Sequence, residues 1–263
     1  MDLLRGTVAV ARRAGVTTLA GSLAYFAFVS LVPLGVLVVL VVATVAGEPT
    51  GSRALAATTE ALEPGVGTLI ESTVRDARGR FGATLVGGAL LVFGVGRLFH
   101  GLEGGFAAVY AERRERSAAD ALRDAAVVGA ADVAALSAVA LAAARLPFAV
   151  SEGWLAPVGT LALFCGLVVA VLPTFVVFPE PDVGVREALP GAALSALAWT
   201  LATVAVRWYA AAGGGWRYGA LGVVLLALAW LYVGGLCVLV GAALNAVRGG
   251  HVSADDAWVA DYL

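Results

Sequence analysis

Charged side chains are scarce in this sequence, and their scarcity excludes most soluble folds. Asp, Glu, Lys and Arg together make up 14% of the 263 residues, whereas soluble domains are about one quarter charged. Hydrophobic residues make up 60% of the chain, and the mean hydropathy is +0.91. No soluble core needs this much apolar surface, so the composition predicts an integral membrane protein.

Lysine is absent, and histidine and cysteine are rare, which removes several classes of chemistry. His100 and His251 are the only histidines, and Cys165 and Cys237 lie in apolar runs without the spacing of metal ligands. A metal-dependent nuclease needs clustered carboxylates or histidines. Neither a phosphate-binding glycine loop nor a serine-hydrolase motif occurs. We therefore expect no enzymatic activity, no metal and no cofactor, and the net charge of −2 gives no reason to expect a nucleic-acid partner.

The longest charge-free run covers residues 14–47 and contains Ser30 and Pro33. Its core, residues 20–45, would form a helix about 39 Å long, more than the roughly 30 Å of a bilayer's hydrocarbon core. Pro33 has no N–H and frees the carbonyl of Val29, which needs a partner in lipid. Ser30 or a neighbouring helix could supply that partner. The run predicts a transmembrane helix with a kink.

Further apolar runs predict an all-α polytopic membrane protein. Six transmembrane helices are expected, at about residues 20–45, 82–106, 125–144, 156–178, 189–209 and 219–245. The number falls to five if the short, glycine-rich run 81–96 does not span. Residues 48–80 form a mixed-charge extracytoplasmic segment with an amphipathic helix at 53–63. The helices form one domain over residues 1–248, and residues 249–263 form a polar tail.

The distribution of arginine predicts the orientation of these helices. With the N-terminus inside, ten arginines fall on the inner side and seven on the outer side, counted along the chain. Arginine favours the cytoplasmic side of membrane proteins, so we expect both termini in the cytoplasm. Glycines crowd residues 82–96 and 234–241. Small residues allow membrane helices to approach closely, so these stretches predict tight helix contacts.

Asp132 is the sharpest candidate for a functional residue because it lies near the middle of the run 125–144. A carboxylate at the bilayer centre costs roughly 2.5–3.5 kcal/mol on insertion scales, so it should face the bundle or a cavity. One interpretation is a carboxylate linked to a proton, a cation or a polar headgroup. The other is a structural hydrogen bond between helices, or a shallower position in the membrane.

The other candidate residues each have two interpretations, one functional and one structural. Ser30 and Pro33 either line a pathway, as broken helices do in transporters, or form a kink that serves helix contacts, which we favour. Tyr25 lies several residues inside its span, whereas Tyr218 suits the aromatic belt at the membrane surface. Asn245, near the end of the last helix, is interpreted as a C-cap.

Arg97, His100 and Glu103 follow one another at three-residue spacing, which places them on one helical face. They form either a polar stripe at the mouth of a cavity, suited to anionic headgroups, or a solvated or snorkelling face at the membrane edge. We favour the second interpretation.

Three ordered landmarks resemble the YihY/BrkB family of inner-membrane proteins. The first is residues 24–33, AYFAFVSLVP. The second is Pro190-Gly191, opening a helix that ends near Trp208-Tyr209. The third is residues 218–222, YGALG, followed by WLY at 230–232 and GAALN at 241–245. The family usually has an acidic residue where Ala243 stands, so the chain departs from the pattern there.

The resemblance implies six transmembrane helices in the plasma membrane and no settled activity. An early ribonuclease label for the family is regarded as mistaken, and the residues above argue against it. Some members have been linked to movement of lipids or lipid-linked molecules. The leading hypothesis is therefore a transporter or flippase-like protein whose partners are membrane lipids or a lipid-like substrate. The alternative is a non-transporting membrane scaffold that binds partners through the charged loop 111–124.

Overall fold

The computed structural model describes residues 2–45, 77–111, 123, 126–131, 156–179, 183–211 and 219–252. All regular elements in these ranges are α-helices, as predicted, and no strand occurs among them. The labelled helices are α1 (Asp2–Arg13), α2 (Val16–Val45), α5 (Ala77–Tyr110), α7 (Ala156–Val177), α8 (Val185–Ala211) and α9 (Gly219–Arg248). Residues 126–131 add a short helical stretch.

Several of these helices are long and apolar enough to cross a membrane. Four candidate spans occur among the described residues, at Leu85–Tyr110, Thr160–Val177, Val185–Ala205 and Val224–Arg248. The bent pair Leu3–Arg13 and Val16–Leu31 gives a fifth. These helices fit a multi-pass membrane protein. The predicted span 125–144 and the segment 48–80 lie largely outside the described residues, so the number six stays a prediction.

The run 81–96 belongs to one continuous helix. α5 extends unbroken for 34 residues from Ala77 to Tyr110, despite its glycines. α8 also begins earlier than expected. It starts at Val185, so Pro190 lies inside the helix and not in its first turn. The Gly184 carbonyl accepts hydrogen bonds from the amides of Glu187 (2.9 Å) and Ala188 (3.0 Å), which fixes the new start.

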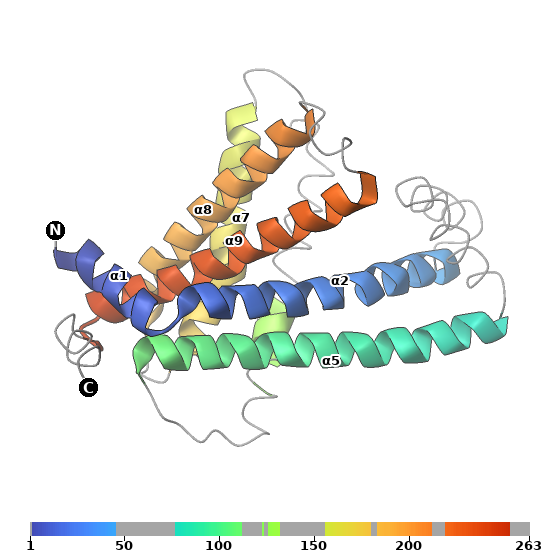
Figure 1. Cartoon of the computed structure of the whole chain (residues 1–263), viewed down its shortest axis with the longest axis horizontal. Coiled ribbons are helices and arrows are strands. Elements are labelled where there is room, and N and C mark those ends of the chain that lie inside the picture. Colours follow the sequence, from blue (N-terminus) through green and yellow to red (C-terminus); the bar gives the residue numbers. More distant parts are fainter. Residues whose placement is uncertain are drawn as a thin grey trace.

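α9 occupies the centre of the bundle and contacts α1, α2, α5 and α8, while α2 pairs with α5 and α7 with α8. Figure 1 shows the helices meeting at the end that carries α1 and diverging away from it. We call the first region the converging end. Its core contains Phe106, Phe175 and Leu239, all fully buried. The rings of Phe106 and Phe175 meet edge to face, with centroids 5.5 Å apart.

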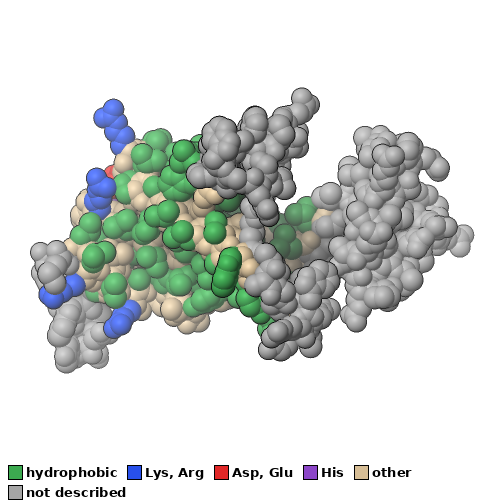
Figure 2. All heavy atoms as spheres, turned by 90° about the horizontal axis from the view of Figure 1, so that it is seen from above, with side chains coloured by type: hydrophobic (Ala, Val, Ile, Leu, Met, Phe, Trp, Pro, Cys, Tyr) green, Lys and Arg blue, Asp and Glu red, His purple; other side chains and the backbone are tan. Residues whose placement is uncertain are grey.

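The opposite region, the splayed end, presents apolar side chains outward. It comprises residues 85–93 of α5, 161–169 of α7, 197–209 of α8 and 224–225 of α9. Large hydrophobic residues are exposed in every one of these stretches, for example Val92 (74%) and Leu161 (61%). Figure 2 shows many hydrophobic side chains on the surface of the described part. A surface of this kind suits contact with lipid or with another apolar molecule.

The first predicted span is preceded by a separate helix that the sequence pattern did not reveal. α1 ends at Arg13, and the chain turns by 62° before α2 begins. Gly15 makes the corner with a φ of +63°, a conformation that other residues adopt only with strain. The Gly15 amide donates to the Arg12 carbonyl at 3.0 Å and so closes the last turn of α1.

Candidate functional site

Ser30 lies in the contact between α2 and α5, and Pro33 follows it on α2. Ser30 is buried, and a side chain at Gly94 of α5 would collide with its Oγ. Ser30 Oγ donates to the Phe26 carbonyl at 2.7 Å. It therefore does not serve the carbonyl of Val29 that Pro33 frees, which corrects that suggestion. Both residues are buried, and this position fits the interpretation that Ser30 and Pro33 serve helix contacts.

Arg97, His100 and Glu103 share one face of α5, as their spacing predicted. His100 Nδ1 lies 3.9 Å from Glu103 Oε2, and the His100 side chain is 76% exposed. The Arg97 guanidinium carbon lies 5.2 Å from the centroid of the Phe26 ring on α2. Tyr25, itself 59% exposed, places its ring edge-on to Phe26, with centroids 5.3 Å apart. We call this set, Tyr25, Phe26, Arg97, His100 and Glu103, the polar stripe.

The polar stripe lies within a candidate span. Arg97 lies inside α5, 20 residues after its start at Ala77 and 13 residues before its end at Tyr110, so about 20 Å of helix separates it from the nearer end. Snorkelling arginine side chains are typical of helix ends, whereas Arg97 lies in the interior of α5. Asp132 and Tyr218, the remaining predicted residues, lie outside the described residues.

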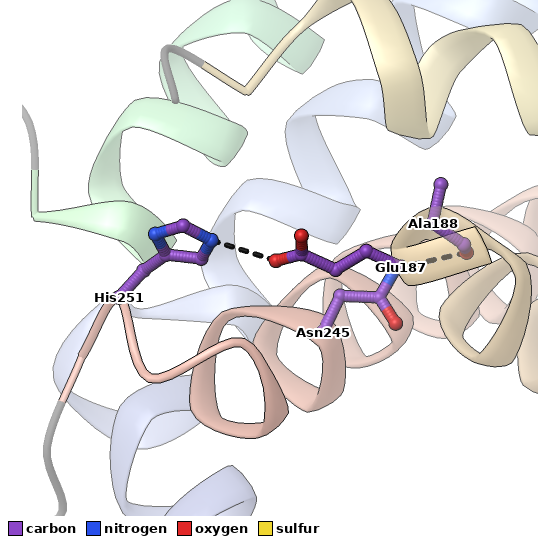
Figure 3. A network of polar contacts seen from close by, with 4 residues as sticks. All are labelled: Glu187, Ala188, Asn245 and His251. Atoms are coloured by element: carbon purple, nitrogen blue, oxygen red, sulfur yellow. Dashed lines mark hydrogen bonds and ion pairs between the residues drawn. The ribbon is translucent and has the colours of Figure 1, made fainter. Parts of the chain in front are cut away.

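A second polar centre joins α8 to α9 through the amide of Asn245. Asn245 is fully buried. Its Oδ1 accepts a hydrogen bond from the backbone amide of Gly191 at 2.8 Å, and its Nδ2 donates to the carbonyl of Ala188 at 2.9 Å. Figure 3 shows the Asn245 side chain reaching the first turns of α8. The C-cap interpretation is therefore wrong, because Asn245 bridges two helices.

The helices approach closely beside Asn245 because Gly191 and Gly241 face each other. A Cβ on Gly241 would lie 2.5 Å from the carbonyl oxygen of Gly191 and 2.5 Å from Ser195 Oγ. Ser195 Oγ donates to the Gly191 carbonyl and lies equally close, 2.8 Å, to the carbonyl of Cys237. The second and third sequence landmarks thus meet in space as one helix–helix contact, which we call the glycine–asparagine contact.

A hydrogen-bonded pair, Glu187 and His251, lies at the same end of the bundle. His251 Nε2 lies 2.7 Å from Glu187 Oε1, with both side chains about one-third exposed. Figure 3 shows this pair beside the Asn245 bridge. The His251 ring also faces Tyr110 of α5, with centroids 5.8 Å apart. Residues from α5, α8 and the segment after α9 therefore meet at this point.

The position of His251 follows from the way in which α9 ends. Gly250 has a φ of +73°. The amide of His251 donates to the Ala246 carbonyl at 3.0 Å, and the amide of Gly250 donates to the Val247 carbonyl at 3.3 Å. This hydrogen-bond pattern is a Schellman motif. It turns residues 249–252, the start of the predicted polar tail, back onto the bundle.

The sequence reasoning did not identify Glu187, His251 or the bridging role of Asn245. The sequence did contain a pattern that could have indicated this contact. Gly191 and Ser195 in the second landmark helix are four residues apart, as are Gly241 and Asn245 in the third landmark. Four-residue spacing aligns side chains on one helical face. No group of three or more His, Cys, Asp or Glu side chains suited to a metal ion occurs in the described part of the chain.

Comparison with protein families gives a match over nearly the whole chain. The family described as "Virulence factor BrkB" matches residues 7–257. The match includes all three landmarks, the polar stripe and the glycine–asparagine contact. No curated protein and no solved structure matches the chain significantly.

Proposed function

Because the chain belongs to the virulence factor BrkB family, we propose that it works in the plasma membrane as a transporter or flippase-like protein for a lipid or another amphipathic substrate. The proposal includes no enzymatic step. Membrane lipids are the expected partners, and both termini are assigned to the cytoplasm.

The polar stripe is the observation that carries this proposal. Arg97 and His100 are exposed on the outside of α5, within a candidate span. An arginine facing hydrocarbon at this depth costs roughly 2.5–3.5 kcal/mol on insertion scales. A polar headgroup against the stripe would lower that cost, since Arg97 can donate charge-assisted hydrogen bonds to phosphate oxygens.

The surroundings of the stripe suit the rest of an amphipathic molecule. On α5 itself, Leu90 is 47% exposed and Phe93 is 58% exposed. Leu90 lies two turns and Phe93 one turn before Arg97 on the same helix. A lipid whose headgroup contacts Arg97 could therefore keep its acyl chains against apolar side chains or in the bilayer. This arrangement favours an amphipathic substrate over a small hydrophilic one.

The side of the membrane follows from the arginines at the converging end. Arg5 and Arg12 of α1, Arg186 of α8 and Arg248 of α9 are all exposed. Figure 2 shows several basic side chains at one end of the described part. By the positive-inside rule this end faces the cytoplasm. The sequence has no nucleotide-binding motif, so movement would follow the substrate's own gradient or an ion gradient, with Asp132 as a candidate for ion coupling.

The test is movement of fluorescent phospholipids across vesicles that contain the purified protein. We expect faster movement than in empty vesicles. Arg97→Gln should slow it about tenfold or more, because it removes hydrogen bonds to a charged group, while Arg97→Lys should retain part of the rate. Arg248→Gln removes an exposed arginine outside the stripe and serves as the control.

Two results would count against the proposal. Wild-type vesicles that move no phospholipid and no isoprenoid-linked lipid above the background would favour the scaffold. Equal rates for Arg97→Gln and Arg248→Gln would remove the stripe from the pathway.

A further inference from the structure

α1 is too short to cross a bilayer, and the chain does not need it to do so. Its 12 residues extend about 18 Å, against roughly 30 Å of hydrocarbon. α2 alone has 30 residues, or about 45 Å of helix. The 62° turn at Gly15 sets α1 aside from the axis of α2. α1 therefore has the geometry of a helix that lies along the membrane surface.

One face of α1 is held by the protein. Val10 is fully buried in the core of the converging end, and Thr7 is 5% exposed. Thr7 Oγ1 donates to the Leu3 carbonyl at 2.8 Å, so its hydroxyl is satisfied within the helix. This face packs against α9. The orientation of α1 around its own axis is thereby fixed, and so is the identity of the residues that face outward.

The outer face combines apolar and basic side chains in two neighbouring strips. Leu4 is 72% exposed and Val8 is 52% exposed; four residues apart, they lie within about 40° of each other around the helix. Arg5 and Arg12 are also exposed, and seven residues apart they lie within about 20°. Val8 and Arg12 are again four residues apart. An apolar strip therefore runs directly beside a basic strip.

From this outer face we infer that α1 is an in-plane helix that binds anionic phospholipid headgroups at the cytoplasmic surface of the membrane. The apolar strip of Leu4 and Val8 enters the region between headgroups and acyl chains, while Arg5 and Arg12 contact the phosphates. Amphipathic helices with leucine on one side and arginine on the other bind membrane surfaces in this way. The site lies on a helix separate from the polar stripe and does not depend on transport.

Charge at the converging end supports an anionic partner. Arg186 and Arg248 are exposed as well, and Figure 2 shows several basic side chains at one end of the described part. Glu187 lies here as well but already contacts His251 at 2.7 Å. Each arginine near an anionic membrane surface strengthens binding about fivefold. The loss of Arg5 and Arg12 together should therefore weaken binding about thirtyfold.

The experiment measures lipid binding to the full-length protein in detergent by native mass spectrometry. The probes are phosphatidylglycerol and phosphatidylcholine with identical acyl chains. The wild type should retain phosphatidylglycerol in preference to phosphatidylcholine. The double variant Arg5→Gln/Arg12→Gln should lose that preference. Leu4→Gln/Val8→Gln, which keeps both arginines, should bind both lipids more weakly.

The matched control is Arg186→Gln/Arg248→Gln, which removes the same charge from the same end but from α8 and α9. It should weaken the preference for phosphatidylglycerol less than Arg5→Gln/Arg12→Gln does, because Arg186 and Arg248 do not lie on α1 beside the apolar strip. Equal loss in the two arginine variants would overturn the inference, because binding would then follow total surface charge. Equal retention of the two lipids by the wild type would overturn it as well. If the double variant at Arg5 and Arg12 does not fold, the single variants are compared with single control variants in the same way.

Discussion

The converging end and the splayed end are built from the same few residue types but are held together differently. At the converging end, facing glycines bring two backbones into contact, and a buried amide and hydroxyl bridge them. At the splayed end, leucine, valine and tryptophan side chains point outward. Both regions contain long apolar helical stretches, and the hydropathy of a stretch does not show which of its faces are buried. The difference lies in which helical faces meet another helix.

Our proposals divide function along the same line. The converging end holds the bundle together and contacts the membrane surface, and the polar stripe with the splayed end contacts the substrate. Three changes test the structural half of this contrast, in order of expected effect.

Gly241→Ala should have the largest effect on stability. The new methyl would lie 2.5 Å from the carbonyl oxygen of Gly191, and a backbone atom cannot move aside cheaply. Overfilled contacts of this kind cost about 1–3 kcal/mol or more. The purified protein is heated in detergent, and unfolding is measured as the loss of the folded fraction in size-exclusion chromatography.

Gly88→Ala is the control for that change. A Cβ at Gly88 of α5 meets nothing within 4 Å, and alanine favours helix over glycine by roughly 0.5–1 kcal/mol. We expect unchanged or slightly raised stability. Equal destabilisation by both substitutions would mean that α8 and α9 do not approach as described.

Asn245→Leu should have the next largest effect. Leucine is branched at Cγ like asparagine but is bulkier, and it leaves the amide of Gly191 without its 2.8 Å acceptor. An unsatisfied buried group costs about 1–3 kcal/mol. Ser22→Ala is the comparison, since the Ser22 hydroxyl is exposed and bonds only within its own helix, to the Leu19 carbonyl at 2.8 Å. A melting temperature for Asn245→Leu equal to that of Ser22→Ala would contradict a bridging role.

Breaking the contact between Glu187 and His251 should have the smallest effect on stability. Both side chains are about one-third exposed, and surface pairs contribute about 0–1 kcal/mol. A double-mutant cycle with Glu187→Ala and His251→Ala should give a coupling in that range. Hydrogen exchange at residues 249–252 should rise in each single variant, since the pair ties the end of α9 to α8. A coupling free energy well above that range would contradict this prediction. It would mean that the contact between Glu187 and His251 stabilises the fold as strongly as the buried hydrogen bonds of Asn245 do.

Much of the fold was predictable because its signals are local. Hydropathy runs identified the helices now seen at 77–110, 156–177 and 219–248, and spacing placed Arg97, His100 and Glu103 on one face. The turn at Gly15 was missed because the prediction rested on the charge-free run 14–47 and assigned no helix to the residues before it. The early start of α8 was missed because Pro190 suggested a first helical turn, although Gly184 supplies the carbonyl that begins the helix.

The candidate site was less predictable because it depends on partners distant in sequence. Gly88 and Gly241 both lie in glycine-rich stretches that predicted tight contacts, yet only Gly241 meets another backbone. Nothing in its own neighbourhood distinguishes Asn245 from a C-cap, since its partners Ala188 and Gly191 lie 57 and 54 residues away.

The sequence alone determined that this is an all-α, apolar chain of the BrkB type, because composition, helical period and ordered motifs are properties of neighbouring residues. Tertiary structure decided which glycines touch, why Asn245 is buried, how α1 turns aside and which side chains around Arg97 stay exposed. Those outcomes depend on the rotation and contact of whole helices, and no single helix carries that information.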